Sequence, residues 1–161
     1  MSTSIHHPAE APAVDPTTAP YAALILRVAL GVVFIAHALA KLLIFTLPGT
    51  AAFFAQHGFP GWTAYPVFAV ELVGGIALIA GVYARWVALA LLPVLLGAIT
   101  VHWGNGWSFT APNGGWEFVG FLIAAVLVQV GLGDGALALR RSPALARERD
   151  SRVVRPAARA A

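Results

Sequence analysis

The chain has 161 residues, is 59% hydrophobic and 11% charged, and carries a formal net charge of +3. With a mean hydropathy of +0.79, it holds more apolar mass than a soluble domain of this size can bury, so lipid is the expected solvent for most of its surface. It has no cysteine, which excludes disulfides, thiolate metal sites, iron–sulfur ligation and CxxC redox chemistry by the chain itself.

Residues 1–20 are rich in Pro, Ala and Thr and show no apolar periodicity, so we expect a disordered N-terminal lead. This lead lacks the positive charge of a signal-peptide n-region. An A-x-A pattern occurs at Ala38-Leu39-Ala40, after the first apolar stretch. Because that stretch contains Arg27 and His37, it resembles a retained anchor more than a cleaved signal.

Four apolar runs come next, each near the ~20 residues that a helix needs to cross a bilayer. They cover residues 21–44, 64–82, 86–101 and 116–133. Pro66 falls in the first turn of the second run, where proline is tolerated. The third run is short and holds Pro93, which predicts a kink or a tilted span. Because no run has a polar side, the fold class expected for residues 21–139 is an all-α, integral membrane four-helix bundle.

The two connections at residues 45–63 and 102–115 contain no Lys, Arg, Asp or Glu but many Phe, Trp, Gly and Pro residues. Such segments are typical of an aromatic belt that lies on or dips into the membrane interface. Two interpretations are open. The aromatic residues anchor the chain at the interface, or they form a lid over a hydrophobic ligand site.

The charge of the C-terminal tail orients the chain. Residues 140–161 contain seven Arg against Glu148 and Asp150, a net charge of +5. We expect this basic, flexible tail to stay in the cytoplasm, held loosely at anionic headgroups. Four crossings place both termini on that same side, and Arg85, in the short link between the second and third runs, agrees as a topology determinant. Nucleic-acid binding is not expected, because the tail lacks interleaved aromatic residues.

Ionisable residues interrupt the apolar runs, although a charge near the bilayer centre costs roughly 2.5 to 3.5 kcal/mol on insertion scales. At about 100° per residue, Arg27, His37 and Lys41 share one stripe of the first helix, which therefore faces the bundle interior. The other three helices supply ionisable groups at the depth of His37 and Lys41. We expect one polar pocket in the outer half of the bundle, lined by His37, Lys41, Glu71, His102 and Glu117.

Lys41 and Glu71 are the expected ion pair of this pocket, since opposite charges attract strongly at low dielectric. The pair either holds two helices together as a structural contact or takes part in the function of the pocket. His37 is alternatively a helix-to-helix hydrogen-bonding residue, and His102 and Glu117 are alternatively solvated at the interface. Arg27 and Arg85 are assigned structural charges. The partner of Arg27 is left open between Asp134 and backbone carbonyls.

A metal site is not expected, because a di-iron carboxylate bundle needs Glu-x-x-His pairs and the sequence contains none. Haem is not expected either, since His37 and His102 both lie near one surface of four short helices, which leaves little enclosing volume.

Over residues 21–139, seven short motifs occur in an order and with a spacing that resemble those of the DoxX family. They are Arg27-x-x-x-Gly31, His37-x-x-x-Lys41, Gly58-Phe59-Pro60, Glu71-x-x-Gly74-Gly75, Gly81-x-x-x-Arg85, His102 with Asn105-Gly106, and Gly115-x-Glu117. The resemblance implies a four-helix, multi-pass protein of the bacterial inner (plasma) membrane. It also implies association with quinone-linked redox systems, including thiosulfate oxidation, and with membrane oxidoreductase complexes that handle oxidative stress.

The chain departs from the family pattern at two places. Ala38 follows the first-helix histidine where the family usually has Gly, and the usual ending G-x-G-R-x-S-x-D is replaced by Gly-Leu-Gly-Asp-Gly-Ala-Leu-Ala at residues 131–138. No role of that terminal polar cluster is therefore carried over to this chain.

Two functional hypotheses remain. In the first, the chain is a membrane redox subunit that binds a quinone in the outer-half pocket, acting at most as an oxidoreductase with a partner. His37 or Lys41 then donates to a quinone oxygen, and Glu71 or Glu117 relays protons. In the second, the chain is a non-catalytic scaffold or small-molecule carrier that recruits a partner oxidoreductase. The expected partners are the lipid bilayer, an oxidoreductase subunit and a second copy of the chain.

Overall fold

The structure, a computed structural model, describes residues 14–143. Residues 1–13 and 144–161, which carry most of the expected lead and tail, lie outside the described residues. The described part is helical and contains no strand, only an isolated bridge between Val82 and Arg140. Its elements are α1 (Ala19–Leu43), α2 (Leu47–Gln56), η1 (Gly61–Thr63), α3 (Ala64–Ala80), α4 (Ala84–His102), η2 (Trp103–Asn105) and α5 (Glu117–Leu132).

Helices α1, α3, α4 and α5 lie close to the four ranges expected from the apolar runs. Within the described residues, α1 and the two helices extended by their 3-10 turns, Gly61–Ala80 and Ala84–Asn105, are long and apolar enough to cross a membrane. Helix α5 is apolar but has 16 residues, a length of about 24 Å, so it is a short span. Helix α4 continues through Pro93, which therefore does not end it. The architecture is the expected all-α membrane bundle.

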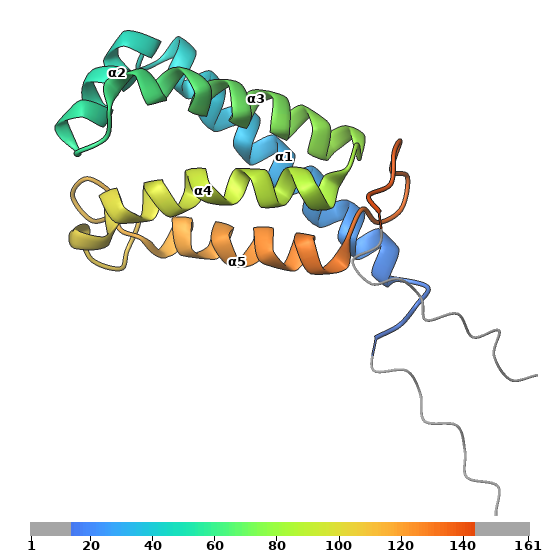
Figure 1. Cartoon of the computed structure of the whole chain (residues 1–161). Coiled ribbons are helices and arrows are strands. Elements are labelled where there is room, and N and C mark those ends of the chain that lie inside the picture. Colours follow the sequence, from blue (N-terminus) through green and yellow to red (C-terminus); the bar gives the residue numbers. More distant parts are fainter. Residues whose placement is uncertain (1–13, 144–161) are drawn as a thin grey trace, which may run out of the picture.

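Each helix of the bundle packs against two others. Helices α1 and α4 both contact α3 and α5, so the four helices close a ring (Figure 1). We name the end that holds α2 and the α4–α5 connection the outer end, and the opposite end, with the start of α1, the α3–α4 turn and the segment after α5, the inner end, after the orientation expected from the sequence. The Ala136 N–H donates to the Pro20 carbonyl at 2.8 Å, so both described ends of the chain meet at the inner end.

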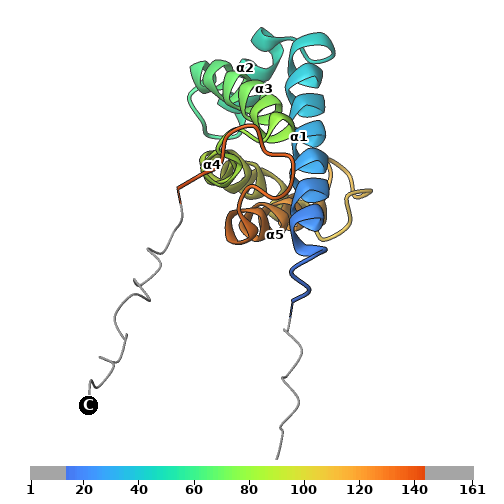
Figure 2. The same cartoon turned by 90° about the vertical axis from the view of Figure 1, so that its right-hand side faces the viewer.

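The segment after α5, residues 133–143, crosses the inner end of the bundle (Figure 2). Its backbone bonds tie it to the α3–α4 turn: Arg140 N–H donates to Gly81 O at 3.0 Å, and Tyr83 N–H donates to Arg140 O at 2.8 Å. The turn itself depends on Gly81, which adopts a left-handed conformation (φ 69°) and ends α3. We call residues 133–143 the inner strap.

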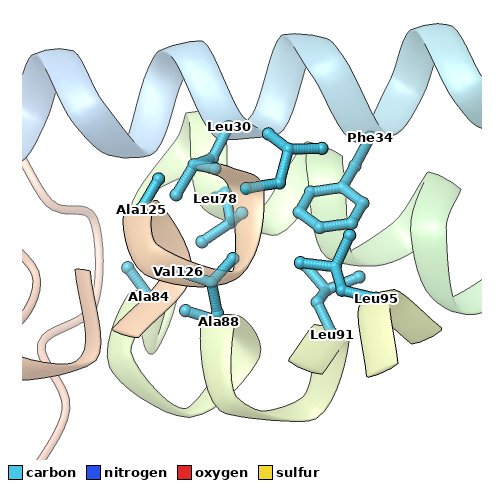
Figure 3. Packing of buried hydrophobic residues seen from close by; sticks show 10 residues of the cluster. Leu30, Phe34, Leu78, Ala84, Ala88, Leu91, Leu95, Ala125 and Val126 are labelled. Carbon is cyan, nitrogen blue, oxygen red and sulfur yellow. The ribbon is translucent and has the colours of Figure 1, made fainter. Parts of the chain in front are cut away.

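The apolar core lies between the two ends of the bundle. Figure 3 shows Leu30 and Phe34 of α1 packed against Leu78 of α3, Leu91 of α4 and Val126 of α5. All five side chains are at most 2% exposed. On α1 this core separates Arg27 from His37 and Lys41, so the polar residues are divided between an inner and an outer group.

The connection at residues 45–63 contains α2, a helix that apolar periodicity does not predict. Thr46 caps it, since its Oγ1 accepts the Gly49 N–H at 3.2 Å, and Pro48 occupies its first turn. Phe45, Phe53 and Trp62 around it are exposed. The Thr-Leu-Pro start is the local signal for this helix, and its exposed aromatic residues suit a helix at the membrane interface.

Helices α1 and α3 touch backbone to backbone where they cross. A Cβ added at Gly31 would lie 2.6 Å from Gly75 O, and one added at Gly75 would lie 2.8 Å from Gly31 O. Both distances are shorter than real Cβ contacts, so the two helices can approach this closely only because both residues are Gly.

Gly31→Ala should therefore push α1 and α3 apart and lower the free energy of unfolding in detergent by about 1 to 3 kcal/mol, the usual cost of overpacking. Gly131→Ala is the matched control, since a Cβ there meets no atom within 4 Å. Alanine in a helix is intrinsically favoured over glycine, so the control should be neutral or stabilising. Equal melting temperatures of the two variants would contradict the close crossing.

Candidate functional site

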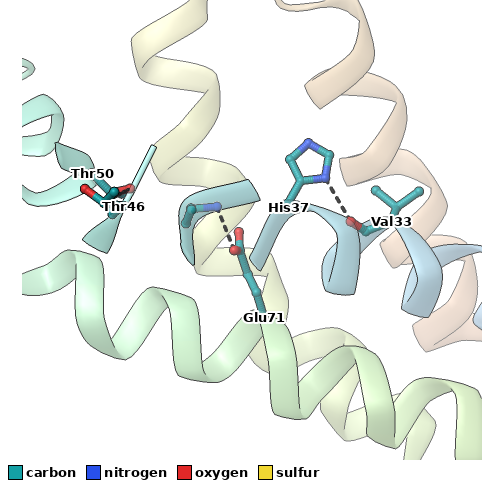
Figure 4. Close-up of polar contacts among 6 residues, drawn as sticks. Val33, His37, Thr46, Thr50 and Glu71 are labelled. Atoms are coloured by element: carbon teal, nitrogen blue, oxygen red, sulfur yellow. Dashed lines mark hydrogen bonds and ion pairs between the residues drawn. The ribbon is translucent and has the colours of Figure 1, made fainter. Parts of the chain in front are cut away.

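Lys41 of α1 and Glu71 of α3 form an ion pair in the outer half of the bundle. Lys41 Nζ donates to Glu71 Oε2 at 2.6 Å, and the side chains are only 16% and 6% exposed (Figure 4). It is the one salt bridge among residues 14–143. The expected pair is confirmed, and it replaces two isolated charges in lipid by one neutral, hydrogen-bonded unit.

His37 lies one turn before Lys41 but binds elsewhere. Its Nδ1 lies 2.8 Å from Val33 O (Figure 4), and since a carbonyl oxygen only accepts, Nδ1 is the donor of this hydrogen bond. The imidazole stacks on Phe118 of α5, with ring centroids 6.0 Å apart and an interplanar angle of 17°. His37 is thus directed toward the start of α5.

His102 and Glu117 brace the α4–α5 connection. His102 Nδ1 donates to Gly114 O at 3.0 Å, and Glu117 Oε1 accepts the Phe109 N–H at 2.9 Å. Asn105 Nδ2 donates to the same Gly114 oxygen at 3.0 Å. These bonds fold the connection back onto the ends of α4 and α5, a role that sequence spacing alone did not indicate.

Three tryptophans pack together in this connection. Trp116 stacks on Trp103 with centroids 4.9 Å apart, and Trp107 meets Trp116 edge-on at 4.6 Å. Such geometries are the favoured ones for aromatic pairs. The cluster holds the connection as a compact cover over the outer ends of α4 and α5.

Among the five residues expected to line one pocket, the structure joins Lys41 directly to Glu71, while the hydrogen bonds of the other three go to backbone groups. His37 contacts α5 through the ring of Phe118, the residue that follows Glu117 in the sequence.

A cleft of about 490 Å³ opens beside the first turns of α5. Its lining is aromatic apart from one carboxylate and one glycine: Trp107, Phe109, Trp116, Glu117, Phe118, Gly120 and Phe121. A Cβ at Gly120 would lie 3.2 Å from the Trp116 ring, so the absence of a side chain at Gly120 lets the ring pack closely against α5. The cleft can take a flat apolar ring with a polar group turned toward Glu117. The sequence leaves the aromatic residues of the α4–α5 connection open between an interface anchor and a lid over a hydrophobic ligand site, and it does not identify the cleft.

Arg27 belongs to the inner group, where it is 1% exposed. Its guanidinium donates to Leu78 O at 2.7 Å, to Ile79 O at 2.6 Å and to Ala136 O at 2.9 Å. Two of these carbonyls end α3, where the helix dipole favours a cation. Of the two partners left open by the sequence, the backbone carbonyls supply the hydrogen bonds, and Arg27 ties α1 to α3 and the inner strap.

Asp134, the second residue of the inner strap, accepts the Ser142 N–H at 2.6 Å and the Ser142 hydroxyl at 2.8 Å. Burial acts to raise the pKa of Asp134, but the bonds from Ser142 and from the Arg85 and Ala84 backbone outweigh it and hold the pKa below its ordinary 3.8. The carboxylate thus joins both ends of the strap to the start of α4.

Comparisons with known proteins agree with this architecture. The family model described as DoxX matches residues 22–103, about half of the chain. In Bacillus subtilis (strain 168), a protein named "Putative oxidoreductase CatD" is 38% identical over 76 residues, which are 47% of this chain and 55% of that protein. The chain thus matches about half the length of this curated relative. No solved structure matches. The family match includes Lys41, Glu71 and His102 but ends before the residues that line the cleft.

Lys41→Ala should destabilise the fold by about 3 to 5 kcal/mol, because it leaves the Glu71 carboxylate buried without its partner. The Lys41→Ala/Glu71→Ala double variant removes both charges and should regain much of that loss. Unfolding in detergent measures both free energies as a double-mutant cycle. Additive losses would contradict a buried pair.

Asp134→Asn should reduce stability at neutral pH and matter little in acid. Because the folded-state pKa lies below 3.8, the Asp134 carboxylate stabilises the fold above that value, and the contribution disappears as the pH falls through the folded-state pKa. The gap in melting temperature between the parent and Asp134→Asn should therefore be wide at pH 7 and close toward pH 2. A difference in melting temperature that stays constant over this pH range would contradict the hydrogen bonds described for the Asp134 carboxylate.

Proposed function

The chain belongs to the DoxX family, and on that premise we propose that it is a quinone-linked subunit of an oxidoreductase system in the bacterial inner membrane. The relative in Bacillus subtilis carries an oxidoreductase name, which supports the redox class. The chain has no thiol couple of its own, so the electrons come from a partner protein and pass to a bound carrier.

The aromatic cleft at α5 is the observation that carries this proposal. Its walls include Phe118 and Phe121, which are 41% and 68% exposed on a helix surrounded by lipid. A lipid-soluble quinone can enter such a cleft sideways and lay its ring against the aromatic walls. The cleft is mostly apolar with one convergent polar group, as ligand sites usually are.

Reduction of a quinone to a quinol takes up two electrons and two protons, so the site needs a proton donor. Glu117 lies in the cleft wall and His37 stacks on Phe118, another wall residue, which supports a role for both in proton transfer. We assign Glu117 the proton delivery to one quinone oxygen and His37 the supply of protons from the outer side. Lys41 and Glu71 hold α1, which carries His37, against α3.

A second candidate is a non-catalytic scaffold that recruits an oxidoreductase. It is favoured by the hydrogen bonds of Lys41, His102 and Glu117, each of which serves the fold. In that case the exposed aromatic residues of α2 and of the α4–α5 connection contact the partner.

The orientation follows from charge. Arg85, Arg140 and Arg141 lie at the inner end, and the outer connections carry no charged residue before Glu117. In line with the positive-inside tendency, we place the inner end, where both described ends of the chain lie, in the cytoplasm, with the cleft toward the outer side.

Binding of a short-chain quinone to the purified protein in detergent tests the proposal. Decylubiquinone should quench the fluorescence of Trp107 and Trp116 saturably, and Phe118→Ala should weaken binding at least about tenfold, the cost of losing one stacked ring in a small site. Trp62→Phe is the control, since Trp62 lies in η1 and not in the cleft. It should bind as the parent does.

Glu117→Gln keeps the shape of the cleft and removes its ionisable group. With an electron donor present, it should bind quinone but form quinol more slowly. Normal quinol formation by Glu117→Gln would remove Glu117 from the mechanism, and an absence of saturable quenching in the parent would favour the scaffold.

A further inference from the structure

The inner end carries an arginine whose side chain forms no salt bridge among the described residues. The Nε of Arg85 is buried and without a hydrogen-bond partner, and no carboxylate in residues 14–143 lies within salt-bridge distance of its guanidinium. The Asp134 carboxylate accepts the backbone N–H of Arg85, and its other hydrogen bonds come from Ser142 and the Ala84 backbone. Within the described residues, the Arg85 guanidinium thus has no carboxylate bound directly to it.

The position of Arg85 in the fold is unfavourable for a positive charge. It stands in the first turn of α4, where the helix dipole already presents positive charge and disfavours a cation. Its guanidinium also lies against the backbone of Gly133, since a Cβ there would lie 2.7 Å from Nη2. A cation at a positive helix end is stabilised when an anion binds beside it.

Arg140 supplies a second guanidinium at the same turn. Two backbone bonds, to Gly81 and from Tyr83, fix its main chain, and its Cζ lies over the Tyr83 ring at 5.0 Å. Tyr83 and Arg85 are separated by one residue, so the two arginines flank the same short segment. Arg140 is exposed and is therefore open to a ligand.

The surroundings identify the class of anion. Trp86, next to Arg85, is 42% exposed, and tryptophans of this kind mark the level of lipid headgroups. Leu137 and Leu139 of the inner strap, which precede Arg140 in the sequence, are 77% and 78% exposed. Cationic groups next to exposed leucines at the headgroup level match a lipid with an anionic head and acyl chains.

We propose that Arg85 and Arg140 form a binding site for the phosphate of an anionic phospholipid at the inner end of the bundle. Arginine suits this role because its planar fork donates two parallel bonds to phosphate oxygens. The exposed leucines of the strap contact the acyl chains. The bound lipid neutralises Arg85, joins the α3–α4 turn to the inner strap and thereby stabilises this end of the protein. The site is separate from the outer cleft and does not depend on the proposed quinone function.

The test uses the full-length protein in detergent with added phosphatidylglycerol or phosphatidylcholine. Phosphatidylglycerol should raise the melting temperature and bind more tightly than phosphatidylcholine. Arg85→Gln and Arg140→Gln should each weaken phosphatidylglycerol binding at least about fivefold, the change expected for one basic residue at an anionic surface. Binding to phosphatidylcholine and the melting temperature in it should change little, which shows that the variants fold.

The matched control separates this site from the general charge of the chain. Gln replaces five arginines outside the described residues in the full-length protein: Arg147, Arg149, Arg152, Arg155 and Arg159. This control lowers the general attraction of the chain for phosphatidylglycerol, but adding Arg85→Gln to it should weaken phosphatidylglycerol binding by a further factor of about five. The proposal is overturned if Arg85→Gln leaves phosphatidylglycerol binding unchanged in both the parent and the control. It is equally overturned if inorganic phosphate alone stabilises the parent as much as the lipid does, since a free anion is then the ligand.

Discussion

The structure depends on neutralising charged side chains that lipid cannot solvate. Lys41 of α1 and Glu71 of α3 neutralise each other in an ion pair. The Arg27 guanidinium instead donates hydrogen bonds to carbonyls at the end of α3 and in the inner strap. Both solutions join α1 to α3, whose backbones touch at Gly31 and Gly75. The same contacts that remove the electrostatic cost therefore fix the central helix pair, and α4 and α5 pack against it.

The polar residues form two separate groups, one at each end of the bundle. The apolar core around Phe34 and Leu91 keeps the inner and outer polar groups apart. At the outer end, the neutral Lys41–Glu71 pair leaves His37 and Glu117 as the ionisable groups nearest the aromatic cleft. At the inner end, the Arg27 guanidinium donates to three backbone carbonyls, whereas the structure gives the Arg85 guanidinium no hydrogen-bond partner among the described residues. The proposed lipid site is built on this difference.

Hydrophobicity and the cost of charge in lipid were enough to predict the four spans and the Lys41–Glu71 pair from the sequence, and motif spacing was enough for the DoxX resemblance. The sequence did not predict α2, because ten residues capped by Thr46 are too short for an apolar repeat to stand out. Nor did it identify the cleft, whose walls depend on how Glu117 and Trp116 fold the connection back onto α5. Helical spacing places residues on a stripe, but backbone partners such as Val33 O for His37 are settled only by tertiary packing.

The contact between residues 41 and 71 is tested most directly in native membranes by cross-linking, since the chain contains no cysteine. With Lys41→Cys and Glu71→Cys in one full-length chain, a short bismaleimide should join the two thiols rapidly within a single molecule. The matched pair of Leu39→Cys with Glu71→Cys should react much more slowly, because residue 39 lies about 200° around α1 from residue 41. Equal rates for the two pairs would mean that α1 does not turn Lys41 toward α3, which would contradict the account at its centre.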